Sequence, residues 1–130
     1  MNRRNSLKTL AALGAGAALP APAAGHAIQL HVDLEVDPAR EKDLVANFKT
    51  TFQPTIRKQA GFSDVRLLKF RKSMHGDAPA KSFYRLLIAF ESEEHRMAWV
   101  ASADHQRVWP TIEKTLKGAK LVAWLYDIVP

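Results

Sequence analysis

Two histidines are the candidate acid–base groups of this chain of 130 residues. An imidazole with an unperturbed pKa of about 6.5 can accept a proton from a phenol at neutral pH. His105 is the third residue after Ser102, where a polar side chain could instead simply satisfy the start of a helix. His31 lies on the polar face of an alternating segment, where it could act as a base or ligand or could face solvent. His105 and His31 are therefore the predicted catalytic residues.

Aromatic side chains could bind a flat substrate. Trp99 could stack on an aromatic ring, although a tryptophan also packs well in a core because it buries a large apolar area. Tyr84 could form an aromatic wall with Trp124 and Tyr126, or all three could simply pack in an interface. Trp99 and Tyr84 are thus predicted to contact substrate.

Arg85 is the predicted anion-binding residue. A cation among apolar neighbours needs an anionic partner, which could be a substrate or a carboxylate across the sheet, Asp33 or Glu35. Adjacent strand residues point to opposite faces, so at most one of Tyr84 and Arg85 can line a given cavity.

Several other chemistries are not supported by the sequence. The chain has no cysteine, and His-x-His and His-Glu-x-x-His spacings, phosphate-binding glycine loops and nucleophile elbows are absent, so we expect no metal site and no cofactor. From residue 28 onward 16 basic residues are spread among 13 acidic ones, whereas nucleic-acid binding usually needs a concentrated basic patch. We therefore expect no nucleic-acid partner.

Residues 1–27 have the layout of a secretory signal: a charged head, a short apolar middle and a small-residue exit at Gly25-His26-Ala27. The apolar middle is too short to span a bilayer, which takes about 20 residues. The head Arg3-Arg4-Asn5-Ser6-Leu7-Lys8 resembles a twin-arginine export signal, with Ser6 where that family usually has phenylalanine. We expect export to the periplasm, no stable membrane insertion after removal of the signal, and one mature domain over residues 28–130.

Periodicity predicts the order β-α-β-β-α-β over the mature domain. Strict alternation predicts a first strand over 28–36, and further strands are expected over 62–71, 81–91 and 119–129. An apolar helical stripe ends near Gln59 and contains Pro54, which should kink it. Ser92 and Ser102 are predicted N-caps, so the second helical region should consist of two pieces. This order is that of a ferredoxin-like α+β fold, a four-stranded antiparallel sheet with both helices on one face.

The strands over 81–91 and 119–129 are apolar on both faces, yet helices can cover only one face of the sheet. An uncovered apolar face of this size predicts a partner surface. The simplest partner is a second copy, packed sheet against sheet in a two-fold homodimer.

The segment from Glu91 to Trp99, followed by Ser102-Ala103-Asp104-His105 and Trp109-Pro110, resembles the antibiotic biosynthesis monooxygenase family. The shared pattern is an acidic and serine start, a tryptophan, and then a serine and a histidine that open the next helical piece. The resemblance covers essentially all of residues 28–130. It implies a dimeric α+β barrel. Some members of the family oxidise quinols or polyphenols with oxygen and no cofactor.

Other members of this family bind and degrade heme. That branch has a histidine ten residues after the tryptophan and an asparagine on the first strand. In this chain the corresponding residues are Trp109 and either His31 or Val32. Two of three positions thus differ, although His105 could in principle ligate iron from one turn earlier.

The leading hypothesis is a cofactor-independent oxygenase that acts on a small aromatic such as a quinol. Trp99 would orient the ring, His105 or His31 would take a proton, and Arg85 would steady the anion. The alternative is a non-catalytic periplasmic binding or stress-related dimer. A joint site requires His31, Trp99 and His105 to line one cavity.

Export makes a prediction about mass. We expect the native protein to lose residues 1–27, because Gly25-His26-Ala27 offers a cleavage site at the end of the signal. Intact-mass measurement of the periplasmic protein checks this. Replacing both Arg3 and Arg4 with lysine should leave the precursor in the cytoplasm. A full-length cytoplasmic protein would contradict the localisation.

Overall fold

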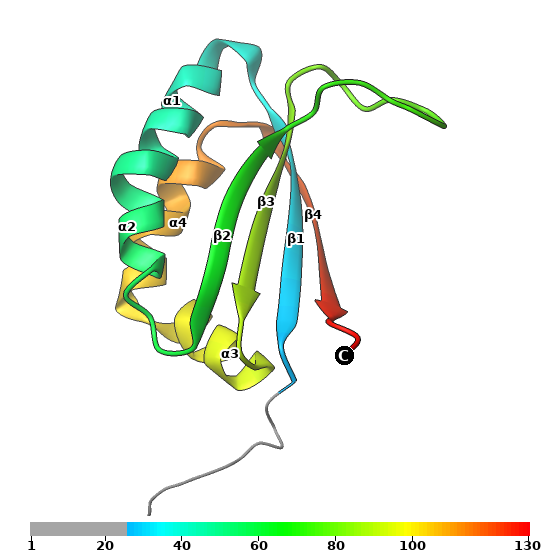
Figure 1. Cartoon of the computed structure of the whole chain (residues 1–130). Helices are drawn as coiled ribbons and strands as arrows, with labels where there is room; N and C mark the ends of the chain where they lie inside the picture. The colour runs from blue at the N-terminus through cyan, green and yellow to red at the C-terminus, as the bar shows by residue number, and fades with distance from the viewer. Residues whose placement is uncertain (1–25) are drawn as a thin grey trace, which may run out of the picture.

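The computed structural model describes residues 26–130, so the predicted signal lies outside the described residues apart from His26 and Ala27. The described chain has an α+β fold in two layers (Figure 1): a four-stranded antiparallel sheet carries all of the helices on one face. The strands are β1 (Ile28–Val36), β2 (Phe62–Lys69), β3 (Phe83–Phe90) and β4 (Leu116–Asp127). The sheet order β2-β3-β1-β4 confirms the ferredoxin-like prediction.

Strand β1 has the bounds that alternation predicts, and it lies in the middle of the sheet between β3 and β4. Its residues Val32, Leu34 and Val36 are buried toward the helices. The intervening side chains of His31, Asp33 and Glu35 are only partly buried. A strand with one apolar and one polar face is thus covered on the apolar face alone.

The first helical region begins where Asp37 accepts a hydrogen bond from the backbone N–H of Ala39 at 3.0 Å. A short 3-10 turn, η2 (Pro38–Arg40), precedes α1 (Glu41–Asn47). The chain then widens into a π-helical segment, η3 (Phe48–Phe52), before α2 (Gln53–Ile56). Pro54 lacks an N–H to donate to the preceding turn, so the irregularity predicted at this proline appears as the π segment beside it.

The second helical region consists of two helices, as predicted. Helix α3 (Glu93–Ala101) begins at Ser92, whose hydroxyl accepts the backbone N–H of His95 at 3.2 Å. Helix α4 (Ala103–Glu113) begins at Ser102 and continues through Pro110. Pro110 therefore lies inside an uninterrupted helix.

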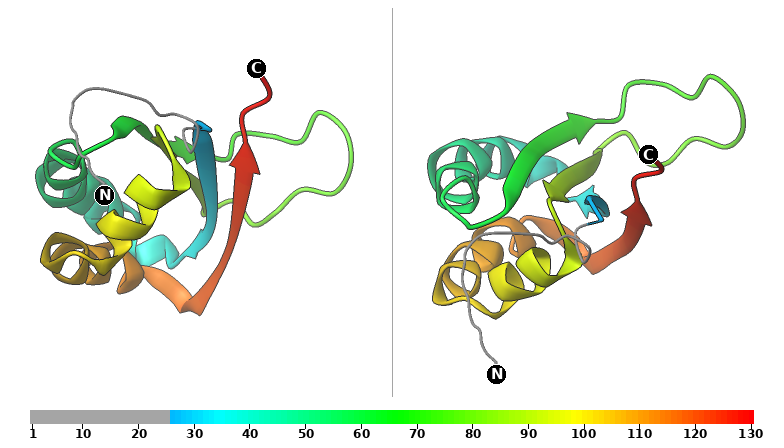
Figure 2. Two further views of the ribbon diagram at one scale, coloured as in Figure 1. Left: turned by 90° about the horizontal axis from the view of Figure 1, so that it is seen from below. Right: turned by 60° about the horizontal axis from the view of Figure 1, so that its bottom comes forward.

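The predicted strand ends differ from the observed ones by one to three residues at the end of β2 and at both ends of β3 and β4. Strand β2 ends at Lys69 and β3 begins at Phe83, so the connection between them is longer than predicted and extends away from the sheet in both views of Figure 2. Strand β4 begins at Leu116, three residues before the predicted start. Gly118 has a φ of 67°, a backbone conformation that favours glycine, and it lies within β4, beside an irregular register between β1 and β4.

The core fills the space between the helices and the sheet. Phe52, Phe90, Leu34 and Leu86 are among its largest fully buried side chains. The other face of the sheet carries no helix (Figure 1), and exposed apolar side chains of β4 gather on it. Among the described residues, no helix is long and apolar enough to cross a bilayer.

Candidate functional site

A cavity of about 140 Å³ lies between the helices and the sheet. Strands, η3 and both helices of the second region contribute to its wall: Leu30, Val32, Phe52, Leu86, Ile88, Arg96, Trp99, Val100, His105, Trp109, Leu121 and Ala123. Ten of these residues are apolar or aromatic, and only Arg96 and His105 carry a charged or titratable group. An apolar wall with few polar groups is typical of a site for a small organic molecule.

Trp99 is positioned by the face of α3 that packs on the core. Its side chain is only 3% exposed. The indole meets the Phe52 ring edge-on at 5.9 Å between centroids and the His105 ring edge-on at 5.1 Å. Trp99 is therefore both a core residue and a wall of the cavity, so the two interpretations of this tryptophan are not exclusive.

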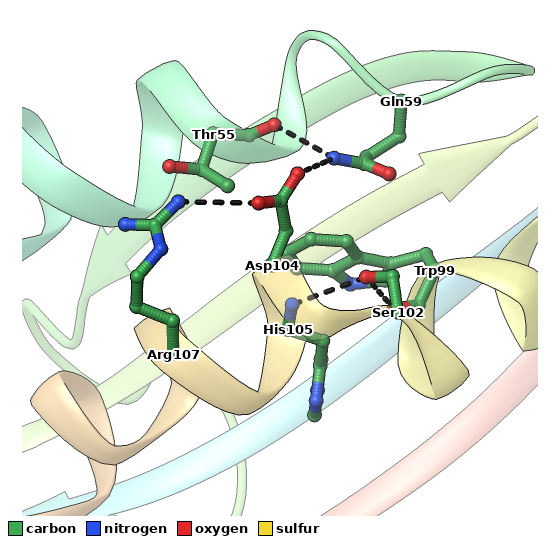
Figure 3. A network of polar contacts seen from close by, with 7 residues as sticks. All are labelled: Thr55, Gln59, Trp99, Ser102, Asp104, His105 and Arg107. Carbon is green, nitrogen blue, oxygen red and sulfur yellow. Dashed lines mark hydrogen bonds and ion pairs between the residues drawn. The ribbon is translucent and has the colours of Figure 1, made fainter.

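His105 lies in the first turn of α4, and its ring points from the helix toward the sheet (Figure 3). It stacks nearly parallel to Trp109, at 6.2 Å and 13°. Its backbone N–H, rather than its imidazole, satisfies the helix start by donating to the Ser102 hydroxyl at 3.1 Å. The side chain is thus free for another role.

The environment keeps the His105 imidazole neutral. Burial lowers its pKa below the ordinary value because the charged form loses hydration. Its Nδ1 atom is buried and has no hydrogen-bond partner within the described part of the chain. An imidazolium carries a proton on both nitrogens, so protonation would leave one N–H without an acceptor.

Ser102 connects the two helices and both aromatic site residues. Its hydroxyl donates to the Trp99 carbonyl oxygen at 2.7 Å and accepts the His105 backbone N–H (Figure 3). Next to it, Asp104 accepts hydrogen bonds from Gln59 at 2.9 Å and Arg107 at 3.2 Å, which lower the pKa of its carboxyl group. The Gln59 contact ties the start of α4 to the end of the first helical region.

The other predicted site residues lie elsewhere. His31 is on the face of the sheet without helices, where its ring lies 4.6 Å from that of Tyr126 and its Nε2 is 2.8 Å from the Gln29 Oε1. The joint site of His31 with Trp99 and His105 is therefore wrong, because β1 lies between them. Arg85 lies on the same open face and donates to both carboxylate oxygens of Asp33, at 2.6 and 3.2 Å. The sequence left two partners possible for Arg85, a substrate or a carboxylate across the sheet, and the structure shows the carboxylate.

Tyr84 is buried on the helix side and does not line the cavity. Its hydroxyl donates to Glu41 at 2.8 Å, and burial together with this carboxylate raises the pKa of Tyr84 to about 12. The aromatic wall of Tyr84 with Trp124 and Tyr126 is wrong, since those two side chains lie on the opposite face. Trp124 pairs across the strands with His31, whereas Tyr84 pairs with the buried Leu34.

Sequence reasoning missed Arg96 and Trp109 as cavity residues. Trp109 is one helical turn after His105, and Arg96 is three residues before Trp99, so both spacings put the side chains on one helix face. These two spacings are the sequence signals that could have identified Arg96 and Trp109. The contribution of Leu121 and Ala123 from β4 required knowing how this distant strand pairs with β1.

No protein-family model and no curated protein matches the chain. Solved structures with the same fold do. One is a candidate antibiotic biosynthesis monooxygenase from Caulobacter crescentus (TM-score 0.66, 16% identity, covering 82% of this chain and 92% of that one). Another, from Bordetella bronchiseptica, is similarly named (TM-score 0.65, 22% identity, 81% and 99% covered). SnoaB from Streptomyces nogalater, a cofactor-independent oxygenase, also aligns (TM-score 0.64, 13% identity, 79% and 93% covered). The chain therefore has the fold of antibiotic biosynthesis monooxygenases.

The neutral state of His105 predicts a pH dependence of stability. Because its folded pKa is lowered, the unfolded state binds more protons, so the group leaves stability intact above about pH 6.5 and reduces it as pH falls toward the folded pKa. Denaturant unfolding of the wild type and His105→Gln should show a larger loss for the wild type between neutral and acidic pH. Parallel curves for the two proteins would contradict the burial of a neutral imidazole.

Proposed function

We propose that this protein is a cofactor-independent oxygenase that oxidises a small electron-rich aromatic, such as a quinol, in the cavity between Trp99 and His105. The observation that carries the proposal is a half-buried imidazole, with its Nδ1 atom buried and its pKa lowered by burial, in a cavity whose other walls are apolar and aromatic apart from Arg96. The likeness of fold to SnoaB, itself a cofactor-independent oxygenase, supports it.

The chemistry needs little from the protein. A phenolate transfers an electron to oxygen far more readily than a phenol, so removing the phenolic proton starts the reaction. His105 takes that proton, and the phenolate formed beside it offsets the cost of the buried imidazolium. Hydroquinone and oxygen then give hydroxybenzoquinone and water, with the substrate supplying every electron that oxygen accepts. The apolar walls exclude water from the reactive intermediate.

The volume of the cavity limits the size of the substrate and shows whether heme could fit. A dry cavity of about 150 Å³ is known to hold one benzene ring, and this cavity is close to that volume. A tetrapyrrole is several times larger than one ring. The residues present therefore do not fit heme, since Trp109 fills the position of the family histidine and stacks on His105.

The activity is tested by replacing the proposed base. We expect His105→Ala to lower oxygen consumption with hydroquinone at least tenfold, because general-base catalysis typically contributes a factor of about 100 or more. An oxygen electrode measures the rate, and labelled oxygen followed by mass spectrometry detects one oxygen atom in the product. Trp99→Phe should chiefly raise KM, since a smaller ring still covers the substrate.

His75→Ala is the matched control, because this histidine lies in the exposed connection between β2 and β3. A fall of the same size in both variants, or wild-type oxygen uptake no faster than buffer, would overturn the proposal. Tight binding of the aromatic without oxygen uptake would instead favour the non-catalytic binding protein.

We further propose that the chain forms a homodimer through the sheet face without helices. Val122, Trp124 and Tyr126 of β4 and the adjoining Ile128 leave large apolar areas exposed on this face. The Asp33–Arg85 pair already neutralises its own charges on this face, so a second copy can cover these two groups without leaving either ion unpaired. His31 would then be an interface residue rather than a base.

The dimer is tested with two aspartate variants of equal exposure. Trp124 on the open face and Met97 on the outer side of α3 are each 57% exposed. Sedimentation should show a dimeric wild type, a dimeric Met97→Asp and a monomeric Trp124→Asp, since a charge at the centre of the interface would be left unpaired. A monomeric wild type, or a Trp124→Asp dimer of unchanged affinity, would contradict it.

We also propose that the folded domain works in the periplasm after export by the twin-arginine route. The absence of cysteine from the chain means that folding there, or before export, requires no disulfide. The N-terminal arginine pair and the small-residue exit support this location.

A further inference from the structure

Arg96 is the one permanently charged residue in the cavity wall, and the mechanism above gives it no role. It lies on α3, three residues before Trp99. Its side chain is 20% exposed, much more than Trp99, so it lies at the rim of the cavity rather than at its closed end. A ligand whose ring contacts Trp99 therefore reaches the guanidinium with a substituent that points toward solvent.

The guanidinium is already fixed along one edge. Its Nε and Nη2 donate to the two carboxylate oxygens of Glu93, at 2.6 and 2.7 Å, and this pairing raises the pKa of Arg96. An arginine has five N–H donors, of which Glu93 accepts two. Within residues 26–130 no other side-chain or backbone acceptor bonds the Arg96 head. The end-on edge formed by Nη1 and Nη2 thus remains available, and its spacing matches the two oxygens of a carboxylate.

We infer that the ligand is an aromatic acid: a single phenolic ring in the cavity whose carboxylate binds the end-on edge of Arg96, as in a dihydroxybenzoate. The carboxylate is favoured over a neutral substituent because the rim otherwise offers only apolar groups and His105, which carries no charge. It is favoured over a second phenolate because one oxygen would use only one of the two parallel donors. Glu93 acts as a positioning residue that holds the guanidinium side-on.

This inference rests on the proposed function for the reaction, but it concerns binding and can be tested without turnover. Trp99 and Trp109 line the cavity, so quenching of tryptophan fluorescence in anaerobic buffer reports ligand binding. The probes are hydroquinone and gentisate, which is the same ring with an added carboxylate. At about pH 7 the carboxyl group is ionised and the phenolic groups of both probes are not.

We expect the wild type to bind gentisate at least tenfold more tightly than hydroquinone. Arg96→Gln should abolish this preference while leaving the affinity for hydroquinone within twofold, and Arg96→Lys should restore only part of it because an ammonium lacks the fork. Glu93→Gln should weaken gentisate binding without changing the affinity for hydroquinone, since the guanidinium is then no longer held side-on. Arg107→Gln is the matched control: Arg107 also pairs with a carboxylate three residues earlier, Asp104, but lies on the surface of α4.

An unchanged gentisate preference in Arg96→Gln, a wild type without preference, or an equal loss in Arg107→Gln overturns the assignment. The variants should keep the wild-type unfolding midpoint within a few degrees, because the Arg96–Glu93 pair is partly exposed and stabilises little. If oxygen uptake fails while the Arg96-dependent preference persists, the oxygenase proposal fails and the assignment of an aromatic acid stands. If oxygen uptake is normal but does not depend on a carboxylate in the substrate, the oxygenase proposal stands and the assignment of an aromatic acid fails.

Discussion

The hydroxyl of Ser102 is the interaction on which the geometry of the site depends. It donates to the last turn of α3 at the carbonyl of Trp99 and accepts from the first turn of α4 at the N–H of His105. One small side chain thereby caps the start of α4 and adds a second hydrogen bond to the Trp99 carbonyl, which also accepts the backbone N–H of Ser102. It also fixes the angle at which the two rings meet, edge-on at 5.1 Å. A cap of this kind is worth about 1 kcal/mol to folding, and here it additionally sets the distance between the ring that would orient a substrate and the base that would deprotonate it.

The cavity itself is a consequence of how aromatic residues fill a two-layer core. Phe52, Trp99, His105 and Trp109 bring large, stiff rings from three helical segments to one place, and such rings contact one another at their edges and faces. Rings of this shape do not interlock as completely as aliphatic side chains, and the remaining volume is bounded by smaller residues such as Ala123 on β4. The same burial that stabilises the fold keeps His105 neutral. Core and site are therefore one structure, and a change that fills the cavity should remove ligand binding without weakening the fold.

The sequence predicted local features well and long-range ones poorly. The strict alternation of residues 28–36 and the caps at Ser92 and Ser102 depend on neighbouring residues only, and all three are confirmed. The start of β4 was misplaced because Gly118 has the backbone conformation of a turn while its strand continues through it. Parity predicts which residues of one strand share a face. It does not predict which faces of different strands coincide, and this is why the expected wall of Tyr84 with Trp124 and Tyr126 combines residues from opposite faces.

The candidate residues on the two faces of the sheet differ in whether their polar groups have partners within the protein. On the open face the candidate residues already have protein partners: Arg85 has Asp33, and His31 has Gln29. On the covered face the cavity holds a base whose Nδ1 has none and an arginine with one free edge. Buried or half-buried polar groups without partners cost free energy, so a fold keeps them where a ligand supplies the missing contacts. The open face can be covered by a surface of similar composition, whereas the cavity requires a molecule with an apolar ring, a proton to give to His105 and an acceptor for Arg96. This difference in satisfied polar groups, more than the depth of either surface, distinguishes the proposed binding site from the proposed dimer surface.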